Sequence, residues 1–245
     1  MSHALVTGGG SGIGRAIALA LAEAGNAVTI CGRRAEALQA VEHPLIRGVV
    51  ADVTDPASVA ALYEQAQAAR GPFDIVVANA GASASAPAAK VTLEDWRAML
   101  DVNLTGAFLT VQPALAAMTK ASSGRIVFVA STAGLKGYPY VAPYVAAKHG
   151  VVGLMRALAA ETAKSGVTVN AVCPGFAETG MLTRSLDAIA AKTGRSEADA
   201  RAALANPQGR FVTPEEVAGA VLWLVSDAAR SVTGQAISIS GGETW

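Results

Sequence analysis

Short apolar runs rich in β-branched residues recur along the chain, separated by longer segments whose apolar positions have helical spacing. Seven runs have the length of a strand and almost no polar interruption. They cover residues 3–7, 27–31, 47–51, 74–78, 125–130, 167–173 and 235–239. Strands that are apolar on both faces are typical of a parallel sheet covered by helices on either side. The pattern therefore predicts an α/β protein with a seven-stranded parallel sheet.

The segments between the runs begin with helix-capping residues. Asp55 is followed by Pro56, Thr92 is followed three residues later by Asp95, and residues 213–216 read TPEE. A side-chain oxygen at such a position accepts from the free N–H groups of the first helical turn. Strands that alternate with helices indicate right-handed crossovers and a doubly wound, Rossmann-type fold. Such a fold has helices on both faces and binds ligands beyond the carboxyl ends of its strands.

One connection is much longer than the others. Residues 176–212 separate two strand-and-helix units, which is long for a connection in a compact domain. We expect this segment to be a helical lid within a single domain of residues 1–245.

Composition and charge narrow the choice of partners. Hydrophobic residues make up 52% of the 245 residues and charged residues 16%, as expected for a large buried core. Nineteen basic residues balance nineteen acidic ones, so no net positive field attracts nucleic acid or an anionic membrane. The uncharged residues 102–119 include Asn103, Gln112 and Pro113, and we expect a buried helix there, not a membrane span.

Cysteine usage and the first residues of the chain bear on location. Cys31 and Cys173 are too few for a disulfide framework, and MSHALVTGGG lacks the charged and apolar regions of a signal peptide. A cytoplasmic location is expected, and no residue is assigned to a metal.

A glycine-rich stretch, TGGGSGIG at residues 7–14, lies between the first predicted strand and the helix after it. Gly8, Gly12 and Gly14 would let the backbone turn tightly and approach a pyrophosphate. The free N–H groups and the dipole at a helix N-terminus favour its negative charge. The spacing differs from the usual G-x-G-x-x-G, so a glycine-rich turn without a ligand is the alternative to a dinucleotide site.

Tyr144 and Lys148 are four residues apart in an otherwise apolar helical stretch. Side chains at this spacing share one face of a helix and can act on the same object. A free tyrosine titrates near ~10, and a nearby cation favours its phenolate form. For the pair in isolation, a half-buried aromatic residue beside a lysine that reaches solvent is the alternative.

Three motifs together resemble the short-chain dehydrogenase/reductase family in its single-domain branch. They are Thr7-Gly8-x-x-x-Gly12-x-Gly14, Asn79-Ala80-Gly81 and Tyr144-x-x-x-Lys148, and the resemblance covers essentially the whole chain. Further matches in the same order are Asp52-Val53, Asn103, Ser131, Pro174-Gly175 and Thr179. The resemblance implies an oxidoreductase that transfers a hydride between a nicotinamide dinucleotide and a secondary alcohol or ketone.

The resemblance also implies roles for individual residues. Tyr144 would be the general acid/base, Lys148 would supply a cation beside it and bond the nicotinamide ribose, and Ser131 would donate to the substrate oxygen. Asn103, the fourth catalytic candidate, would hold a water that links Lys148 to solvent, although an asparagine bonding its own helix backbone is the alternative. The expected cofactor-binding residues are Gly8, Ser11, Gly12, Ile13, Gly14, Arg33, Arg34, Asp52, Val53, Asn79, Ala80, Gly81, Tyr144, Lys148, Pro174, Gly175 and Thr179.

Three of these positions have a more specific expected role. Asp52 resembles the residue that accepts from the adenine amino group, and Asn79 resembles one that braces the strand ends beneath the cofactor. Thr179 would meet the nicotinamide carboxamide.

The end of the second strand bears on the choice of cofactor. A carboxylate about twenty residues after the glycines normally binds the ribose 2′-hydroxyl of NAD, but Gly32 occupies that place. Arg33 and Arg34 follow, and a guanidinium suits a 2′-phosphate by its charge and its forked donors. We therefore predict NADP, with NAD and a solvated arginine pair as the alternative.

Side chains of the stretch before Tyr144 and of the predicted lid bear on the substrate. Apolar side chains that would line a pocket are Ala133, Leu135, Tyr138, Tyr140, Phe176, Met181, Leu182 and Leu186. Lys192, Arg195 and Arg201 could meet the phosphates of a coenzyme A thioester, or form a solvated helix face. The stretches 131–140 and 206–218 resemble family members that act on 3-hydroxyacyl or 3-oxoacyl thioesters. A small cyclic or aromatic alcohol or ketone is the alternative substrate.

Two other classes of function are alternatives to an alcohol or ketone oxidoreductase on this fold. A non-catalytic dinucleotide sensor would tolerate loss of Ser131, Tyr144 or Lys148, and all three are present. A sugar-nucleotide epimerase or dehydratase usually has a longer C-terminal substrate domain than the seventy residues that follow Gly175. The apolar last helix and strand, together with Trp223 and Trp245, suggest a homotetramer, which is common in the family.

Overall fold

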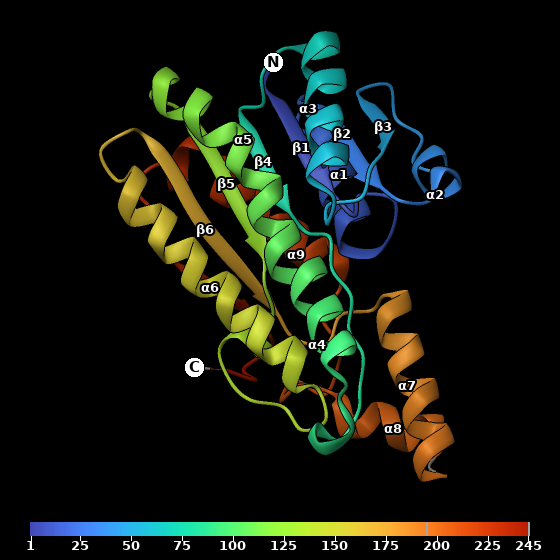
Figure 1. Ribbon diagram of the computed structural model, residues 1–245. Helices are drawn as coiled ribbons and strands as arrows, with labels where there is room; N and C mark the ends of the chain where they lie inside the picture. Colours follow the sequence, from blue (N-terminus) through green and yellow to red (C-terminus); the bar gives the residue numbers. More distant parts are fainter. Residues whose placement is uncertain (195, 245) are drawn as a thin grey trace.

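Within the described part of the chain, seven parallel strands form one sheet in the order β3-β2-β1-β4-β5-β6-β7 (Figure 1). The structure is a computed structural model that describes residues 1–194 and 196–244, except for the side chains of residues 188, 189, 192 and 193. The strands are β1 His3–Thr7, β2 Ala27–Gly32, β3 Ile46–Val50, β4 Ile75–Ala78, β5 Gly124–Val129, β6 Val167–Pro174 and β7 Ala236–Ile239. The predicted seven-stranded, doubly wound sheet is confirmed.

Helices cover both faces of the sheet. They are α1 Gly12–Glu23, α2 Ala35–Gln39, α3 Pro56–Arg70, α4 Leu93–Leu100, α5 Gly106–Ala121, α6 Ala142–Thr162, α7 Gly180–Thr193, α8 Glu197–Leu204 and α9 Pro214–Val225. Short 3-10 turns lie at Ala88–Lys90, Thr132–Gly134 and Asp227–Ala229, and a π-helical turn at Asp101–Thr105 joins α4 to α5. In Figure 1, α5 and α6 lie in front of the sheet and α9 lies behind it.

The strands have two apolar faces because each face meets helices. Leu5 of β1 and Phe128 of β5 point into the core beneath α3, α5 and α6. Their neighbours Val6 and Val127 point into the second core, beneath α1 and α9. Side chains alternate between the two faces of a strand, so burial on both sides requires an uninterrupted apolar run.

The predicted helix starts are also confirmed. Asp55 Oδ1 accepts from Ala57 N at 3.0 Å at the start of α3. Thr92 with Asp95, and Thr213 with Glu216, form reciprocal capping boxes at α4 and α9. Residues 102–119 lie in the π-helical turn and α5, with Pro113 inside the helix. Among the described residues, no helix has both the length and the apolar character needed to cross a membrane.

The 176–212 segment leaves the sheet and returns to the same point. Glu178 N donates to Val212 O and Val212 N donates to Phe176 O, both at 2.9 Å, so its two ends are paired. Between them, α7 and α8 extend beyond the carboxyl ends of the strands (Figure 1). Leu182 and Leu186 pack with Ala200 and Phe211 in a small core of their own.

Candidate active site

The strand order reverses between β1 and β4, and ligands of doubly wound sheets bind at such a point. Asn79, just after β4, donates from Nδ2 to Thr7 O at 2.8 Å and from its backbone N to Thr7 Oγ1 at 3.0 Å. Ala80 N donates to the same hydroxyl at 3.0 Å. These bonds fix the two strand ends against each other and form the floor of the site.

The glycine-rich loop passes over this floor with little room for side chains. A Cβ at Gly14 would lie under 3.0 Å from both Gly8 O and Asn79 Nδ2. Gly12 has a φ of +51°, and a Cβ there would lie 3.1 Å from the Thr179 methyl group. Ser11 precedes α1 in an extended conformation, and its side chain makes no capping hydrogen bond. The first N–H groups of α1, including that of Ile13, are thus left for an anion, and the loop fits the pyrophosphate of a dinucleotide.

Lys148 and Tyr144 lie one turn apart on the same face of α6, as their spacing predicted. The Lys148 side chain is buried, and its Nζ donates to Val129 O, at the end of β5, at 2.9 Å. The ammonium is 5.6 Å from the centre of the Tyr144 ring. Ser131, two residues beyond Val129, contacts Tyr144 through its hydroxyl and accepts from Ala133 N at 3.1 Å. The structure therefore brings the three predicted side chains together at the carboxyl edge of β5.

Burial shifts the pKa values of both Lys148 and Tyr144. It lowers the pKa of Lys148 from 10.5 to about 8, because an ammonium loses its hydration there. It also raises the pKa of Tyr144, and the Ser131 hydrogen bond opposes this only in part. The sequence suggested the opposite direction for the tyrosine, since a nearby cation favours phenolate. In the protein by itself, desolvation of the phenolate is the largest cause of the shift, so the pKa of Tyr144 rises.

Asn103 is buried in the π-helical turn and bonds two segments at once. Its Nδ2 donates to Ala82 O at 2.9 Å and to Met99 O at 3.0 Å, and its Oδ1 accepts from Ala82 N at 3.3 Å. The bond to Met99 O is the helix-backbone contact foreseen as the alternative. A Cβ at Gly81 would lie 2.6 Å from Asn103 Oδ1 and 3.7 Å from Lys148 Nζ. Gly81 therefore lies between Asn103 and the Lys148 ammonium.

The adenosine end of the expected site is more open. Arg33 is 76% exposed, and its Nη1 lies 4.0 Å from Asp52 Oδ2. Asp52 Oδ1 accepts from Thr54 N and Thr54 Oγ1, and these two bonds, more than Arg33, lower the pKa of Asp52. Arg34 precedes α2 and makes no cap, while Val53 is buried in the core, which leaves only its backbone to meet a ligand.

The end of β6 and the start of α7 close the other side. Pro174 is the last residue of β6, and Gly175 N donates to Ile239 O at 3.0 Å. Thr179 precedes α7 and faces Gly12 across the site, while its Oγ1 donates to Ala177 O at 3.3 Å. The glycine-rich loop and the 176–212 segment therefore meet at this threonine.

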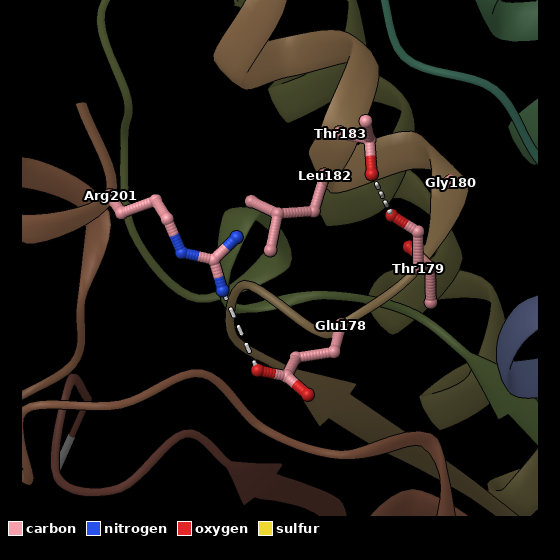
Figure 2. Close-up of a pocket in the computed structure, with 6 residues that line it drawn as sticks. All are labelled: Glu178, Thr179, Gly180, Leu182, Thr183 and Arg201. Carbon is pink, nitrogen blue, oxygen red and sulfur yellow. Dashed lines mark hydrogen bonds and ion pairs between the residues drawn. The ribbon is translucent and has the colours of Figure 1, made fainter. Parts of the chain in front are cut away.

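A cavity of about 360 Å³ lies between Thr179 and α8 (Figure 2). It is lined by Glu178, Thr179, Gly180, Leu182, Thr183 and Arg201. Arg201 pairs with Glu178 at 3.7 Å and with Glu197 at 3.9 Å, and its guanidinium lies 5.0 Å from the centre of the Phe211 ring. Of the three cations expected to meet phosphates, Arg195 and the side chain of Lys192 lie outside the described residues.

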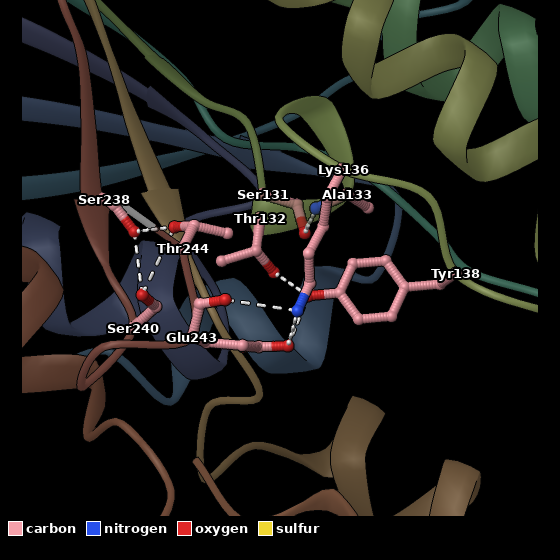
Figure 3. A network of polar contacts seen from close by, with 9 residues as sticks. All are labelled: Ser131, Thr132, Ala133, Lys136, Tyr138, Ser238, Ser240, Glu243 and Thr244. Carbon is pink, nitrogen blue, oxygen red and sulfur yellow. Dashed lines mark hydrogen bonds and ion pairs between the residues drawn. The ribbon is translucent and has the colours of Figure 1, made fainter. Parts of the chain in front are cut away.

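A polar network near Ser131 was not predicted from the sequence (Figure 3). The Tyr138 hydroxyl bonds Thr132 Oγ1 at 2.6 Å and also Glu243 Oε1. Lys136 Nζ donates to Glu243 O at 3.2 Å. Glu243 follows Lys136 by 107 residues, so no local pattern signals the contact. Of the predicted pocket residues, Tyr138 and Phe176 meet edge to face with ring centres 6.3 Å apart.

Among the described residues, no group of three or more His, Cys, Asp or Glu side chains could hold a metal ion.

The doubly wound sheet, the glycine-rich loop at its reversal point and the Ser–Tyr–Lys group beside it define a nicotinamide-dependent oxidoreductase. The family model described as "short chain dehydrogenase" matches residues 2–190, and the chain belongs to this family. It is an NAD(P)-dependent enzyme that interconverts alcohols and ketones.

Two relatives and one solved structure refine the comparison. A putative ketoacyl reductase of granaticin polyketide synthase from Streptomyces violaceoruber is 43% identical, over 98% of this chain and 92% of its own. Cis-4-hydroxycyclohexanecarboxylate dehydrogenase from Sinomonas cyclohexanicum is 42% identical, over 98% and 96%. The crystal structure of a single-residue variant of actinorhodin polyketide ketoreductase with NADPH is 38% identical, with a TM-score of 0.95 over 99% of this chain and 97% of that chain.

Proposed function

We propose that this enzyme uses NADPH to reduce the ketone of a 3-oxoacyl thioester to the 3-hydroxyacyl product. The observation that carries the proposal is the group formed by Ser131, Tyr144 and the buried Lys148 at the end of β5, next to the glycine-rich loop. The similarity to ketoacyl reductases over nearly the whole chain supports the choice of substrate.

Each residue of the group has one task in this reaction. Reduced nicotinamide, when bound, supplies the hydride for the carbonyl carbon. Tyr144 gives its phenolic proton to the ketone oxygen, and Ser131 donates a hydrogen bond to that oxygen. Because burial raises the pKa of Tyr144, the phenol stays protonated at neutral pH, which is the form that reduction needs. Lys148, held in place by its bond to Val129 O, would return a proton to Tyr144 and would itself be reprotonated from solvent through a water beside Asn103.

The cofactor would lie along the reversal point of the sheet. The N–H groups of residues 11–14 would hold the pyrophosphate, Lys148 the nicotinamide ribose, and Thr179 the carboxamide. Arg33 would bind the 2′-phosphate, because it directly follows Gly32, which offers no carboxylate, and its guanidinium is exposed.

The proposal extends to the 176–212 segment and to assembly. The 176–212 segment would act as a lid within the single domain, because it faces Gly12 through Thr179 and meets Tyr138 through Phe176. The chain would form a homotetramer, since β7 is an edge strand that is only partly buried and Trp223 on α9 is 44% exposed. Trp245 lies outside the described residues.

The test is the loss of NADPH absorbance with a panel of substrates: 3-oxoacyl thioesters, cyclic and aromatic ketones, and sugar nucleotides. Fastest turnover per Michaelis constant with a 3-oxoacyl thioester is expected. Preference for a cyclic ketone would favour the second candidate, to which the similarity to the cyclohexanecarboxylate enzyme points. Light scattering that finds a monomer at micromolar concentration would refute the tetramer.

A further inference from the structure

The C-terminal tail, residues 240–244, returns to the candidate active site and meets the stretch 136–138 and Gly175 there. The Glu243 carboxylate bonds the Tyr138 hydroxyl and lies 3.4 Å from Lys136 Nζ. Its other oxygen lies 2.7 Å from the point where a Cβ of Gly175 would stand. The Glu243 side chain is only 14% exposed, so this carboxylate is enclosed by the site and by its lysine partner.

The Glu243 carboxylate fixes the direction of the hydrogen bonds that the Tyr138 hydroxyl makes. An ionised carboxylate can only accept, so the single proton of the Tyr138 hydroxyl goes to Glu243. The Thr132 hydroxyl, 2.6 Å away, then donates to the Tyr138 oxygen. Lys136 adds bonds to the Glu243 backbone and side chain, and its ammonium lies 4.9 Å from the centre of the Tyr138 ring. Within the described residues, the Tyr138 hydroxyl therefore has Thr132 as its donor and Glu243 as its acceptor.

The tail itself is anchored independently of Tyr138. The Ser238 hydroxyl bonds the Ser240 and Thr244 hydroxyls, at 2.8 and 2.5 Å. Figure 3 shows this hydroxyl cluster on the side of Glu243 away from Tyr138. Glu243 thus extends from an anchored tail to Tyr138, one of the side chains predicted to line the substrate pocket.

Ser131 does not depend on this network for its position. Its Oγ accepts from Ala133 N, and its carbonyl accepts from Gly134 N at 2.8 Å. The neighbouring Ala130 N is bonded to Val172 O in β6, also at 2.8 Å. By contrast, the contacts that hold the Tyr138 side chain belong to this network or to the lid. Its hydroxyl bonds Glu243 and Thr132, and its ring meets the Lys136 ammonium and the edge of Phe176.

We propose that Glu243 is a positioning residue that holds Tyr138 as a fixed wall of the substrate pocket. The inference rests on the proposed ketone reduction. Because the network holds the wall and not Ser131, losing it weakens ketone binding and leaves the chemical step largely unchanged. A tyrosine freed from Glu243 would also expose a hydroxyl donor and a mobile ring to the acyl chain.

The experiment measures kcat, the ketone KM and the NADPH KM for Glu243→Ala, Tyr138→Phe and the double variant. Each single variant is expected to raise the ketone KM by about tenfold, with kcat within about threefold. The double variant should also show about a tenfold rise, because both changes remove the same bond. Glu243→Gln keeps an acceptor for Tyr138 and should bring the ketone KM to within about threefold of wild type. Glu23→Ala, an exposed carboxylate on α1, is the matched control.

Three results would overturn the proposal. One is a Tyr138→Phe enzyme with a ketone KM within about twofold of wild type, a result that stands even if Glu243→Ala fails to fold. Another is a rise near a hundredfold in the double variant, which would show independent effects. The third is a lower kcat with unchanged KM, which a merely structural role would give through loss of active enzyme. Wild-type turnover in the same assay tests the proposed function separately, since only ratios between variants bear on Glu243.

Discussion

Replacing Lys148 by methionine should stabilise the protein while removing a residue of the candidate active site. Methionine has a similar length and no charge, so it fills the same buried space. The lysine is 5% exposed, and burial lowers its pKa from 10.5 to about 8. A difference of ~2.5 in pKa corresponds to about 3 kcal/mol of stability that wild type lacks at pH 7.

The net effect at pH 7 is smaller than this penalty. The Lys148 bond to Val129 O at 2.9 Å is lost in the variant, which costs about 1 kcal/mol. Lys148→Met should therefore raise the free energy of unfolding by about 2 kcal/mol at pH 7.

The pH dependence gives the sharper test. Between pH 8 and 10.5 the lysine is protonated in the unfolded chain and largely neutral in the folded one, so the unfolded state binds more protons. Wild-type stability must then rise with pH in this window relative to the variant. From pH 7 to about pH 9.5, wild type should recover about 2 kcal/mol, so that the two proteins become nearly equal.

Urea unfolding followed by circular dichroism, at both pH values, measures the difference between wild type and variant. The subtraction removes the contribution of every other titrating group. Lys164→Met, at an exposed lysine just after α6, is the control and should show no pH-dependent difference. A constant difference between wild type and Lys148→Met from pH 7 to about 9.5 would refute the argument, because it would mean that burial does not depress this lysine's pKa.

The other predictions concern the site directly. Tyr144→Phe should lower turnover by about 10³-fold and leave NADPH binding, followed by fluorescence, unchanged; near-normal turnover would contradict the acid role. Arg33→Ala should lower kcat/KM by about tenfold with NADPH and little with NADH, whereas equal losses would return Arg33 to a surface role. Gly14→Ala places a Cβ under 3.0 Å from a backbone oxygen and a side-chain nitrogen. It should destabilise the fold by about 1–3 kcal/mol in urea unfolding. Gly153→Ala, with open space around it on α6, should not destabilise the fold, and equal effects of the two substitutions would argue against the crowded loop.

Most of the fold could be predicted because its determinants are local. An apolar run such as residues 125–130 specifies a buried strand, and Thr92 with Asp95 specifies where a helix begins. Tyr144 and Lys148 could be paired from the sequence because a helix turn fixes their distance.

What could not be predicted depends on contacts between distant segments. Glu243 meets Tyr138 across 105 residues, and nothing near either residue signals the bond. Leu186 was expected to line a substrate pocket but lies in the core shared with Phe211, because α8 covers it, whereas Leu182 lies in that core and also lines the cavity beside Thr179. The rise in the Tyr144 pKa depends on burial by the surrounding elements, which the spacing of two residues does not report.

The paired ends of the 176–212 segment have a consequence for how such an enzyme can diversify. Because Phe176, Glu178 and Val212 close the base of the segment with backbone bonds, the sheet meets the same boundary whatever part of the segment follows Thr179. Doubling the length of a closed loop costs only about 0.6 kcal/mol in entropy. The helices α7 and α8 can therefore be lengthened, shortened or exchanged with those of a relative as an interchangeable cassette, while the catalytic group on β5 and α6 stays unchanged.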